Sequence, residues 1–173
     1  KPVRAKTGTL VMKLTSAGLF CGIGGLCQGF ERAGFENSWA TDFDPDVAKT
    51  YKHNFSDSTF IQADLKDLDL NSLPPVDVLH GGFPCQSFSQ AGNRKGFGDE
   101  RGRLFLDMME KIAVMESKPS ILVFENSPYI KVGEKGGWFS QVVNRIRLAG
   151  YRFSVANSFE IDARQHAGSP QSR

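Results

Sequence analysis

The fold of this chain is decided by residues 76–89, which read VDVLHGGFPCQSFS. Their first five residues are mostly apolar and predict a buried strand. Gly81 and Gly82 are expected to end that strand, because glycine adopts backbone conformations that other residues avoid. Pro84 restricts the backbone just before Cys85. The sequence therefore predicts a nucleophilic thiol on a stiff loop at the carboxyl end of a strand, where open parallel sheets bind ligands.

The composition is that of an ordinary globular domain, with 173 residues of which 40% are apolar and 23% charged. No apolar run reaches the roughly 18 residues of a membrane helix, and no signal peptide is visible, so we expect a cytoplasmic or nuclear protein without membrane contact. Cys21, Cys27 and Cys85 have no ligand spacing, which argues for a reducing compartment and against a metal site. The net charge of +2 permits a nucleic-acid partner without requiring one.

Strands and helices alternate along the chain, which predicts an α/β fold with a doubly wound, mostly parallel sheet. The predicted strands are residues 14–20, 38–41, 59–62, 76–80, 120–124 and 151–155. The predicted helices are residues 26–33, 45–55, 104–115 and 137–149. Residues 1–11 are basic and unpatterned, and since Met12 is a possible natural start, we expect them to be an extension outside a domain at residues 12–173.

Three groups of residues are expected at the carboxyl edge of this sheet. Residues 21–25 (CGIGG) join the first strand to a helix and bring the backbone close to a ligand, although a purely structural glycine loop is an equal alternative. Asp42 ends the second strand about twenty residues later, where α/β folds bind ribose hydroxyls, whereas Asp44 is equally well explained as a helix cap. Glu125 follows the fifth strand and is expected to share the edge that carries Cys85.

Residues 90–103 are rich in glycine and charge and are too long for a tight connection. Long loops of this kind are often functional, and the basic residues suit a phosphate-bearing substrate. A loop that is merely solvated is the alternative.

In this order, the motifs resemble those of the cytosine-5 DNA methyltransferases over residues 14–173. The most specific match is residues 82–89 (GFPCQSFS), which resemble the nucleophile motif of that family. Further matches are residues 20–25, 42–44, 64–65, 99–105, 125–126 and 171–173.

The resemblance implies a Rossmann-like methyltransferase fold that binds S-adenosylmethionine, and it implies no metal. The residues expected to contact this methyl donor are Phe20, Gly22, Gly24, Gly25, Asp42, Phe43, Asp64, Leu65 and Leu104.

The resemblance also implies methyl transfer to carbon 5 of cytosine in double-stranded DNA, on a base flipped out of the helix. Cys85 would add to carbon 6, Glu125 would hold N3 and the exocyclic amine, and Arg173 would help position the nucleotide. The loop at residues 90–103 would close over the base.

Three departures from the family pattern are visible. Gly18 stands where an acidic residue is usual, and Ser127 stands where valine is usual. The sequence also ends at Arg173, before the target-recognition domain and the last motifs of the family. We therefore expect a fragment or one subunit of a split enzyme, with a second polypeptide carrying the remaining motifs.

Other functions stay open at this point. A transfer-RNA cytosine methyltransferase of the same superfamily and a catalytically silent donor-binding module are two of them. A thiol hydrolase is a third, and it would need a histidine partner for Cys85. His53, His80 and His166 lie in no recognisable partner motif, and His80 is expected to be a core histidine with its hydrogen bonds satisfied.

Overall fold

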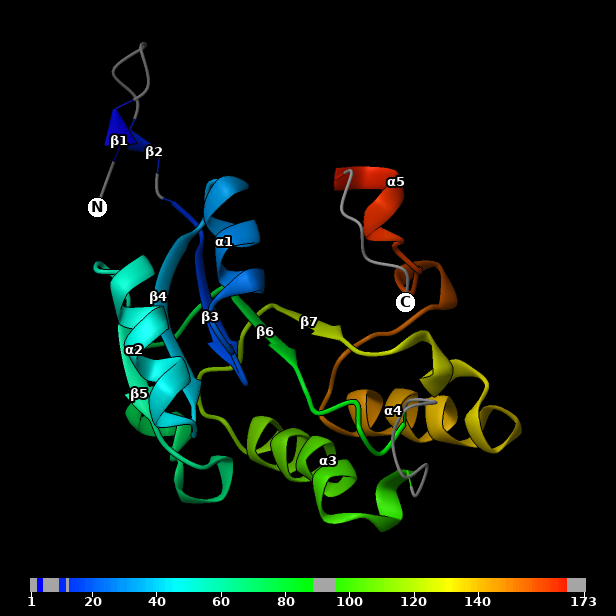
Figure 1. Cartoon of the computed structure of the whole chain (residues 1–173). Coiled ribbons are helices and arrows are strands. Elements are labelled where there is room, and N and C mark those ends of the chain that lie inside the picture. Colours follow the sequence, from blue (N-terminus) through cyan, green and yellow to red (C-terminus); the bar gives the residue numbers. More distant parts are fainter. Residues whose placement is uncertain (1–2, 5–9, 12, 89–95, 168–173) are drawn as a thin grey trace.

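A computed structural model describes residues 3–4, 10–11, 13–88 and 96–167 of the chain. Its centre is a parallel sheet with the strand order β5-β4-β3-β6-β7 (Figure 1). The order reverses between β3 and β6, and such a switch point is where open parallel sheets bind ligands. The strands are β3 (Thr15–Leu19), β4 (Glu36–Asp42), β5 (Thr59–Gln62), β6 (Val78–Gly82) and β7 (Ile121–Glu125).

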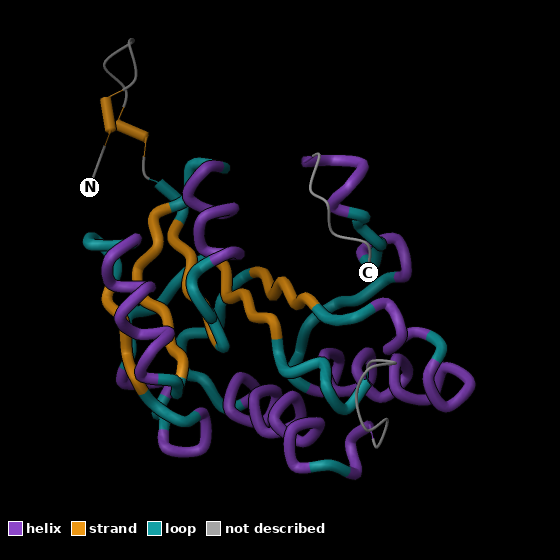
Figure 2. The backbone as a smooth tube through the Cα atoms, viewed as in Figure 1, coloured by secondary structure: helices purple, strands orange, loops and turns teal. Residues whose placement is uncertain are grey.

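Helices cover both faces of the sheet (Figure 2). One face packs against the first two helices through a small core that includes Tyr51 and Phe55, and the other packs against the next two through the main core around Phe105 and Met108. The predicted doubly wound α/β fold is confirmed. The helices are α1 (Gly25–Arg32), α2 (Pro45–Asn54), α3 (Glu100–Ala113), α4 (Gly137–Leu148) and α5 (Ala163–Ala167).

The remaining elements are short. The 3₁₀ turns are η1 (Leu65–Asp67), η2 (Leu70–Ser72), η3 (Gly96–Gly98), η4 (Pro128–Lys131), η5 (Gly133–Gly136) and η6 (Val155–Asn157). Near the amino terminus, where the sequence shows no pattern, β1 (Val3–Arg4) pairs with β2 (Leu10–Val11) in a separate antiparallel ladder. Among the described residues, no helix is long and apolar enough to cross a membrane.

Asp44 is the amino-terminal cap of α2. Its Oδ1 accepts hydrogen bonds from the backbone amides of Asp46 at 2.8 Å and Val47 at 3.4 Å. Pro45 occupies the first helical turn, where its missing amide hydrogen costs nothing. Of the two roles predicted for Asp44, the structure shows the capping role.

Strand β6 ends at the second of the two glycines before the cysteine motif, as predicted, but the predicted reason is wrong, because neither glycine has a positive φ. Strand β6 continues through Gly81 and Gly82, which pair with Phe124 and Glu125 of β7. A Cβ atom at Gly81 would lie only 2.9 Å from the carbonyl oxygen of Leu19 on β3. Glycine is required here because neighbouring backbones approach closely, rather than because the chain turns.

The strand predicted at residues 151–155 is also wrong: in the described part of the chain this segment joins no ladder and enters η6 at Val155. Contacts of its side chains hold this segment outside the described sheet. The Tyr151 hydroxyl donates to the Pro119 carbonyl at 2.8 Å, and the Phe153 ring packs edge-on against Phe139 at 5.9 Å. These tertiary contacts override the strand propensity of an apolar, aromatic stretch.

The long loop predicted at residues 90–103 is shorter than expected. Residues 90–95 lie outside the described residues, Gly96–Gly98 form η3, and α3 begins at Glu100, one turn before the predicted start. The backbone carbonyl of Asp99 accepts the amide of Arg103 at 3.0 Å and starts the helix. Gly102 makes this possible, because a Cβ atom there would overlap the Gly96 carbonyl.

Candidate active site

Cys85 lies three residues beyond the carboxyl end of β6, and Glu125 is the last residue of the neighbouring parallel strand β7. Gly82 at the end of β6 pairs with Glu125 at the end of β7, and a Cβ atom on Gly82 would lie 3.1 Å from Glu125 Oε2. Cys85 and Glu125 are both exposed. The prediction that Glu125 shares the sheet edge carrying Cys85 is confirmed, and the catalytic roles of the two residues stay predictions.

Asn126 ties the segments after these strands together. Its Nδ2 donates to the carbonyl of Phe83 at 2.8 Å, two residues before Cys85, and its Oδ1 accepts the Ser127 amide at 2.9 Å. The Ser127 hydroxyl in turn accepts the Tyr129 amide at 3.4 Å, a bond that valine could not make. The sequence indicated Asn126 only as the neighbour of Glu125, so this linking role was missed.

Hydrogen bonds also join the two ends of the loop that follows Cys85. The Phe88 amide donates to the Cys85 carbonyl at 2.9 Å, and the Gly96 amide donates to the Ser87 carbonyl at 2.9 Å. The Ser87 hydroxyl donates to Asp99 Oδ2 at 2.6 Å. We call Ser87, Phe88, Gly96 and Asp99 the neck of the Cys85 loop. Ser87 and Phe88 are completely buried, so the neck is part of the core.

The glycine loop after β3 leaves space beside its backbone. Phe20 has φ 51°, a left-handed conformation that is strained for a residue with a side chain and that clusters at ligand sites. Gly22 also has positive φ, at 53°. A Cβ atom at Gly22 or Gly25 would meet nothing within 4 Å. The loop therefore has an open side on which a ligand could contact the backbone.

Asp42 joins this loop to β4. Its Oδ2 accepts the Gly22 amide at 2.9 Å, and its Oδ1 accepts the Asp44 amide at 3.2 Å. A carboxylate has about four acceptor positions, so these bonds leave capacity for a ligand. The side chain of Phe43 is 69% exposed beside it. The structure adds a scaffolding role for Asp42 to the predicted ribose contact.

The other predicted donor contacts have structural explanations of their own. Asp64 caps η1 by accepting the Lys66 amide at 3.1 Å. Leu65 is buried in the main core and Leu104 is half-buried against it. Their contact with a donor stays a prediction, and Arg173 lies outside the described residues.

Gly18 is packed against a buried histidine. A Cβ atom at Gly18 would lie 2.9 Å from His80 Cε1 and 3.1 Å from Cys27 Sγ, which leaves no room for a carboxylate. His80 is completely buried and stacks on Phe30 of α1 at 4.6 Å. Within the described residues neither of its ring nitrogens has a hydrogen-bond partner, so the prediction of a satisfied histidine is wrong. Burial lowers the pKa of His80 to about 4, because the charged ring would lose its hydration.

Two of the three thiols are unsuited to attack. Burial raises the pKa of Cys21 and of Cys27, since a thiolate is poorly solvated in the core. Cys85 is the exposed thiol of the three.

The comparisons with known proteins agree with this geometry. Residues 14–173 match the family model of C-5 cytosine-specific DNA methylase. The chain belongs to this family. Among curated relatives, the Type II methyltransferase M.Bsp6I of Bacillus sp. (strain RFL6) is 37% identical over 164 residues, 92% of this chain and 50% of that protein. M.NlaX of Neisseria lactamica is 36% identical over 158 residues, 90% of this chain and 48% of that protein.

Solved structures show the same fold as this chain. A prophage-encoded putative DNA modification methyltransferase from E. coli has a TM-score of 0.63 and 29% identity, covering 78% of this chain and 38% of that one. The S. pombe Dnmt2 methyltransferase has a TM-score of 0.60 at 18% identity, which shows the fold alone. The chain spans about half the length of the curated relatives M.Bsp6I and M.NlaX.

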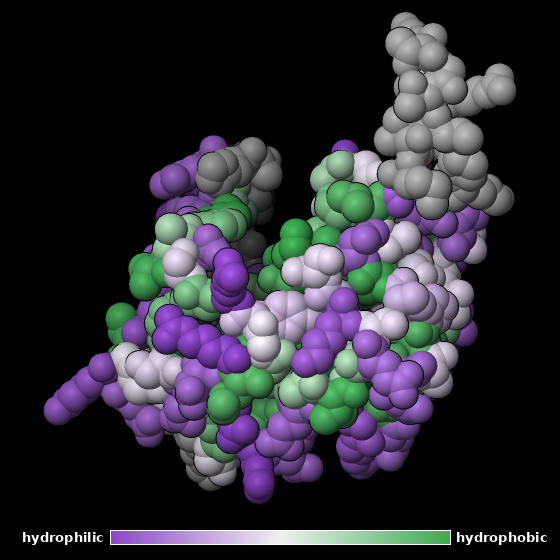
Figure 3. Space-filling model, turned by 180° about the vertical axis from the view of Figure 1, so that it is seen from behind, coloured by the Kyte–Doolittle hydropathy of each residue, from purple (hydrophilic) through white to green (hydrophobic). Residues whose placement is uncertain are grey.

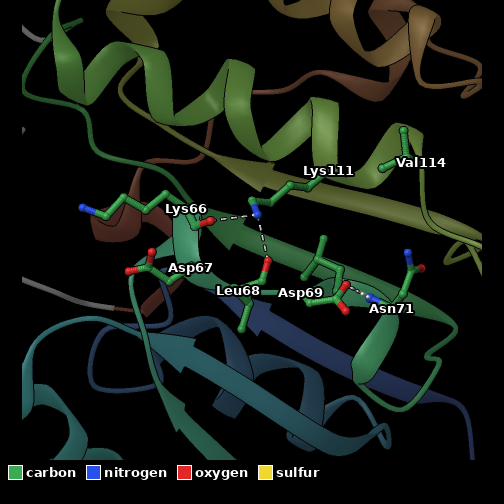
Figure 4. A pocket seen from close by; sticks show the side chains of 8 residues that line it. Lys66, Asp67, Leu68, Asp69, Asn71, Lys111 and Val114 are labelled. Carbon is green, nitrogen blue, oxygen red and sulfur yellow. Dashed lines mark hydrogen bonds between the residues drawn. The ribbon is translucent and has the colours of Figure 1, made fainter.

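An open pocket of about 320 Å³ lies elsewhere on the chain, between α3 and the turns that follow β5 (Figure 4). Lys111 reaches across it and donates to the carbonyls of Lys66 at 3.1 Å and Leu68 at 2.8 Å. None of the predicted catalytic or donor-contacting residues lines it. The pocket is therefore bridged by structural hydrogen bonds and is separate from the candidate active site.

A substitution at Gly24 tests whether the glycine loop requires glycine at that position. Gly24→Ala is expected to lower the free energy of unfolding by at least about 2 kcal/mol, because φ is 96° and the added Cβ would overlap the Phe55 ring. Gly25→Ala, one residue later and in open space, should change it little. Urea unfolding measures both variants, and equal midpoints for the two would contradict this account.

Proposed function

We propose that this chain is the catalytic part of a DNA methyltransferase that methylates carbon 5 of cytosine. The observation that carries the proposal is the pairing of Gly82 with Glu125, which sets the exposed Cys85 and a carboxylate at adjoining strand ends. Strand β3, which leads into the glycine loop, pairs with β6 in the same sheet. Membership of the C-5 cytosine-specific DNA methylase family supports the choice of substrate. In this proposal residues 12–173 are the catalytic domain and residues 1–11 an extension.

Cys85 is the proposed nucleophile. Carbon 5 of cytosine is a weak nucleophile, and addition of the Cys85 thiolate to carbon 6 forms an S–C bond and shifts electron density onto carbon 5. Glu125 holds N3 and the exocyclic amine and stabilises the charge that develops as the thiolate adds. After methylation the proton on carbon 5 leaves to solvent, the S–C bond breaks, and the thiolate is restored. Arg173 is proposed to position the flipped nucleotide.

S-adenosylmethionine is the proposed methyl donor, and the residues present fit it. The open backbone at Gly22 and Gly25 can accept a ligand, Asp42 has acceptor capacity for ribose hydroxyls, and the exposed Phe43 ring can pack against adenine. Phe20, Gly24, Asp64, Leu65 and Leu104 complete the proposed site. When bound, the cofactor supplies an electrophilic methyl group.

The proposed partners are double-stranded DNA and the half of the enzyme that the relatives possess beyond the matched region. In the described sheet β7 is an edge strand, and its Ile121 and Val123 side chains are 54% and 36% exposed. Phe159 and Ile161 are also exposed, and Figure 3 shows a hollow between the carboxyl-terminal part of the molecule and the part below the amino terminus. We propose that further strands and a target-recognition domain, on the same chain or on a second polypeptide, cover this region.

Covalent trapping tests the proposed function. The chain, together with a polypeptide that supplies the region its relatives have beyond the matched residues, is incubated with S-adenosylmethionine and a pool of DNA duplexes that contain 5-fluorocytosine, whose fluorine blocks the final elimination. We expect a DNA adduct that survives a denaturing gel and maps to Cys85. Transfer RNA carrying the same base is the control. An adduct on transfer RNA alone, or no adduct when calorimetry shows that the donor binds, would refute the proposal.

A further inference from the structure

Trp138, the second residue of α4, lies against the neck of the Cys85 loop. It is only 4% exposed, and its ring packs edge-to-face on Phe88 at 5.4 Å and 80°. On the other side of the neck, a Cβ atom added to Gly96 would overlap the indole Nε1 and Cε2. The indole therefore contacts the chain both before and after residues 89–95.

The opposite side of the indole faces the segment that follows Glu125 and Asn126. A Cβ atom at Gly133 would overlap Cε3 and Cζ3 of Trp138, and the Tyr129 ring lies 6.5 Å from it. Trp138 is thus packed between the loop that carries Cys85 and the continuation of the strand that carries Glu125. No motif identified in the sequence includes it.

The turn that leads into α4 is strained. Glu134 and Lys135 both have left-handed conformations, with φ 48° and 54°. Such conformations are unfavourable for residues with side chains and persist where the surrounding packing requires them. Here the turn connects Gly133 to Trp138, and both ends of that connection are buried. The strained turn therefore determines the position from which the Trp138 side chain enters the core.

We propose that Trp138 is a positioning residue for Cys85. It holds Phe88 and Gly96 together, and through the bond from the Phe88 amide to the Cys85 carbonyl it fixes the thiol relative to Glu125. Its effect reaches the substrate only through the neck. The inference rests on the proposed function, in which Cys85 and Glu125 act on the same base. A misplacement of about 1 Å between reacting groups can lower the reaction rate about 100-fold.

Amide hydrogen exchange tests the inference without requiring activity. The amides of Phe88 and Gly96 report directly on the neck, because both donate its hydrogen bonds. In Trp138→Leu their exchange is expected to accelerate by about tenfold more than the loss of global stability explains. Gly133→Ala should do the same, although residue 133 lies outside the neck, because it displaces the indole.

Two matched variants serve as controls. Ile146→Ala removes a buried side chain from the same helix, and Gly137→Ala adds a Cβ that meets only Glu134 at ordinary contact distance, 3.4 Å. Both should leave exchange at Phe88 and Gly96 unchanged after correction for global stability. Equal acceleration in the controls, or none in Trp138→Leu and Gly133→Ala, would overturn the inference.

Trapping kinetics then separate the inference from the proposed function. With the region that the relatives have beyond the matched residues supplied, Trp138→Leu should slow adduct formation by about 10- to 100-fold at unchanged DNA affinity, and Trp138→Phe should recover part of the rate. An unchanged rate in Trp138→Leu despite faster exchange would refute the positioning role. A wild-type protein that traps no DNA would refute the proposed function, while the exchange results still decide whether Trp138 holds the neck.

Discussion

Cys85→Ser is expected to form no adduct with 5-fluorocytosine DNA and to lower methyl transfer by at least about 10³-fold. A serine hydroxyl has nearly the size of a thiol but ionises far less readily, so it adds poorly to carbon 6. Cys85 is exposed, so the substitution should leave the free energy of unfolding nearly unchanged. The measurements are adduct yield on a denaturing gel, methyl incorporation into DNA and urea unfolding.

Cys27→Ala is the matched control for this experiment. It removes a thiol that is 1% exposed and whose pKa is raised by burial. We expect a modest loss of stability and retention of the adduct. Adduct formation by Cys85→Ser, or its loss in a folded Cys27→Ala protein, would show that Cys85 is not the nucleophile.

The stability of the chain is expected to fall by up to about 3 kcal/mol between pH 6.5 and pH 4 because of His80 alone. Burial lowers the pKa of His80 from 6.5 in the unfolded chain to about 4 in the folded one. Between these values the unfolded state binds the proton and the folded state does not, so falling pH favours unfolding. Above pH 6.5 both states are neutral and the effect vanishes. The nearby thiols of Cys21 and Cys27 stay neutral in this range, because burial raises the pKa of each.

Urea unfolding across this pH range measures the effect. His80→Leu places an apolar side chain that cannot titrate beside Phe30, and it should remove most of the pH dependence of the stability. His53→Ala changes an exposed histidine at the end of α2 and should preserve the dependence. If His80→Leu and the wild type show the same slope, His80 is not the group that titrates.

Local signals predicted much of the fold. The predicted strands at residues 14–20, 59–62 and 120–124 overlap β3, β5 and β7, because short segments with strand propensity between turn residues favour extended structure. The same reasoning failed at residues 151–155, where a stretch with strand propensity is held by contacts with Pro119 and Phe139. Strand formation requires a partner, and a local run does not show whether one is available.

The candidate site likewise combines features that were predictable from the sequence with features that were not. The adjoining strand ends near Cys85 and Glu125 were predictable, because Glu125 ends one strand and Cys85 follows shortly after another strand of the same parallel sheet. The bond from Asn126 to Phe83 was not, because it joins residues 43 positions apart in the sequence. The sequence predicts that Asp42 binds a ligand, whereas its bond to the Gly22 amide is visible only in three dimensions.

The sequence by itself determined the alternation of strands and helices and the residue types at the strand ends, because these depend on local periodicity and on the chemistry of single side chains. Only the tertiary structure decided the strand order, the packing of His80 beneath Gly18, and the position of Trp138 against the neck of the Cys85 loop. These features arise from contacts between segments distant in the chain. Whether a glycine turns the backbone or admits a neighbour, and whether a buried histidine finds a partner, depends on what the fold brings beside it.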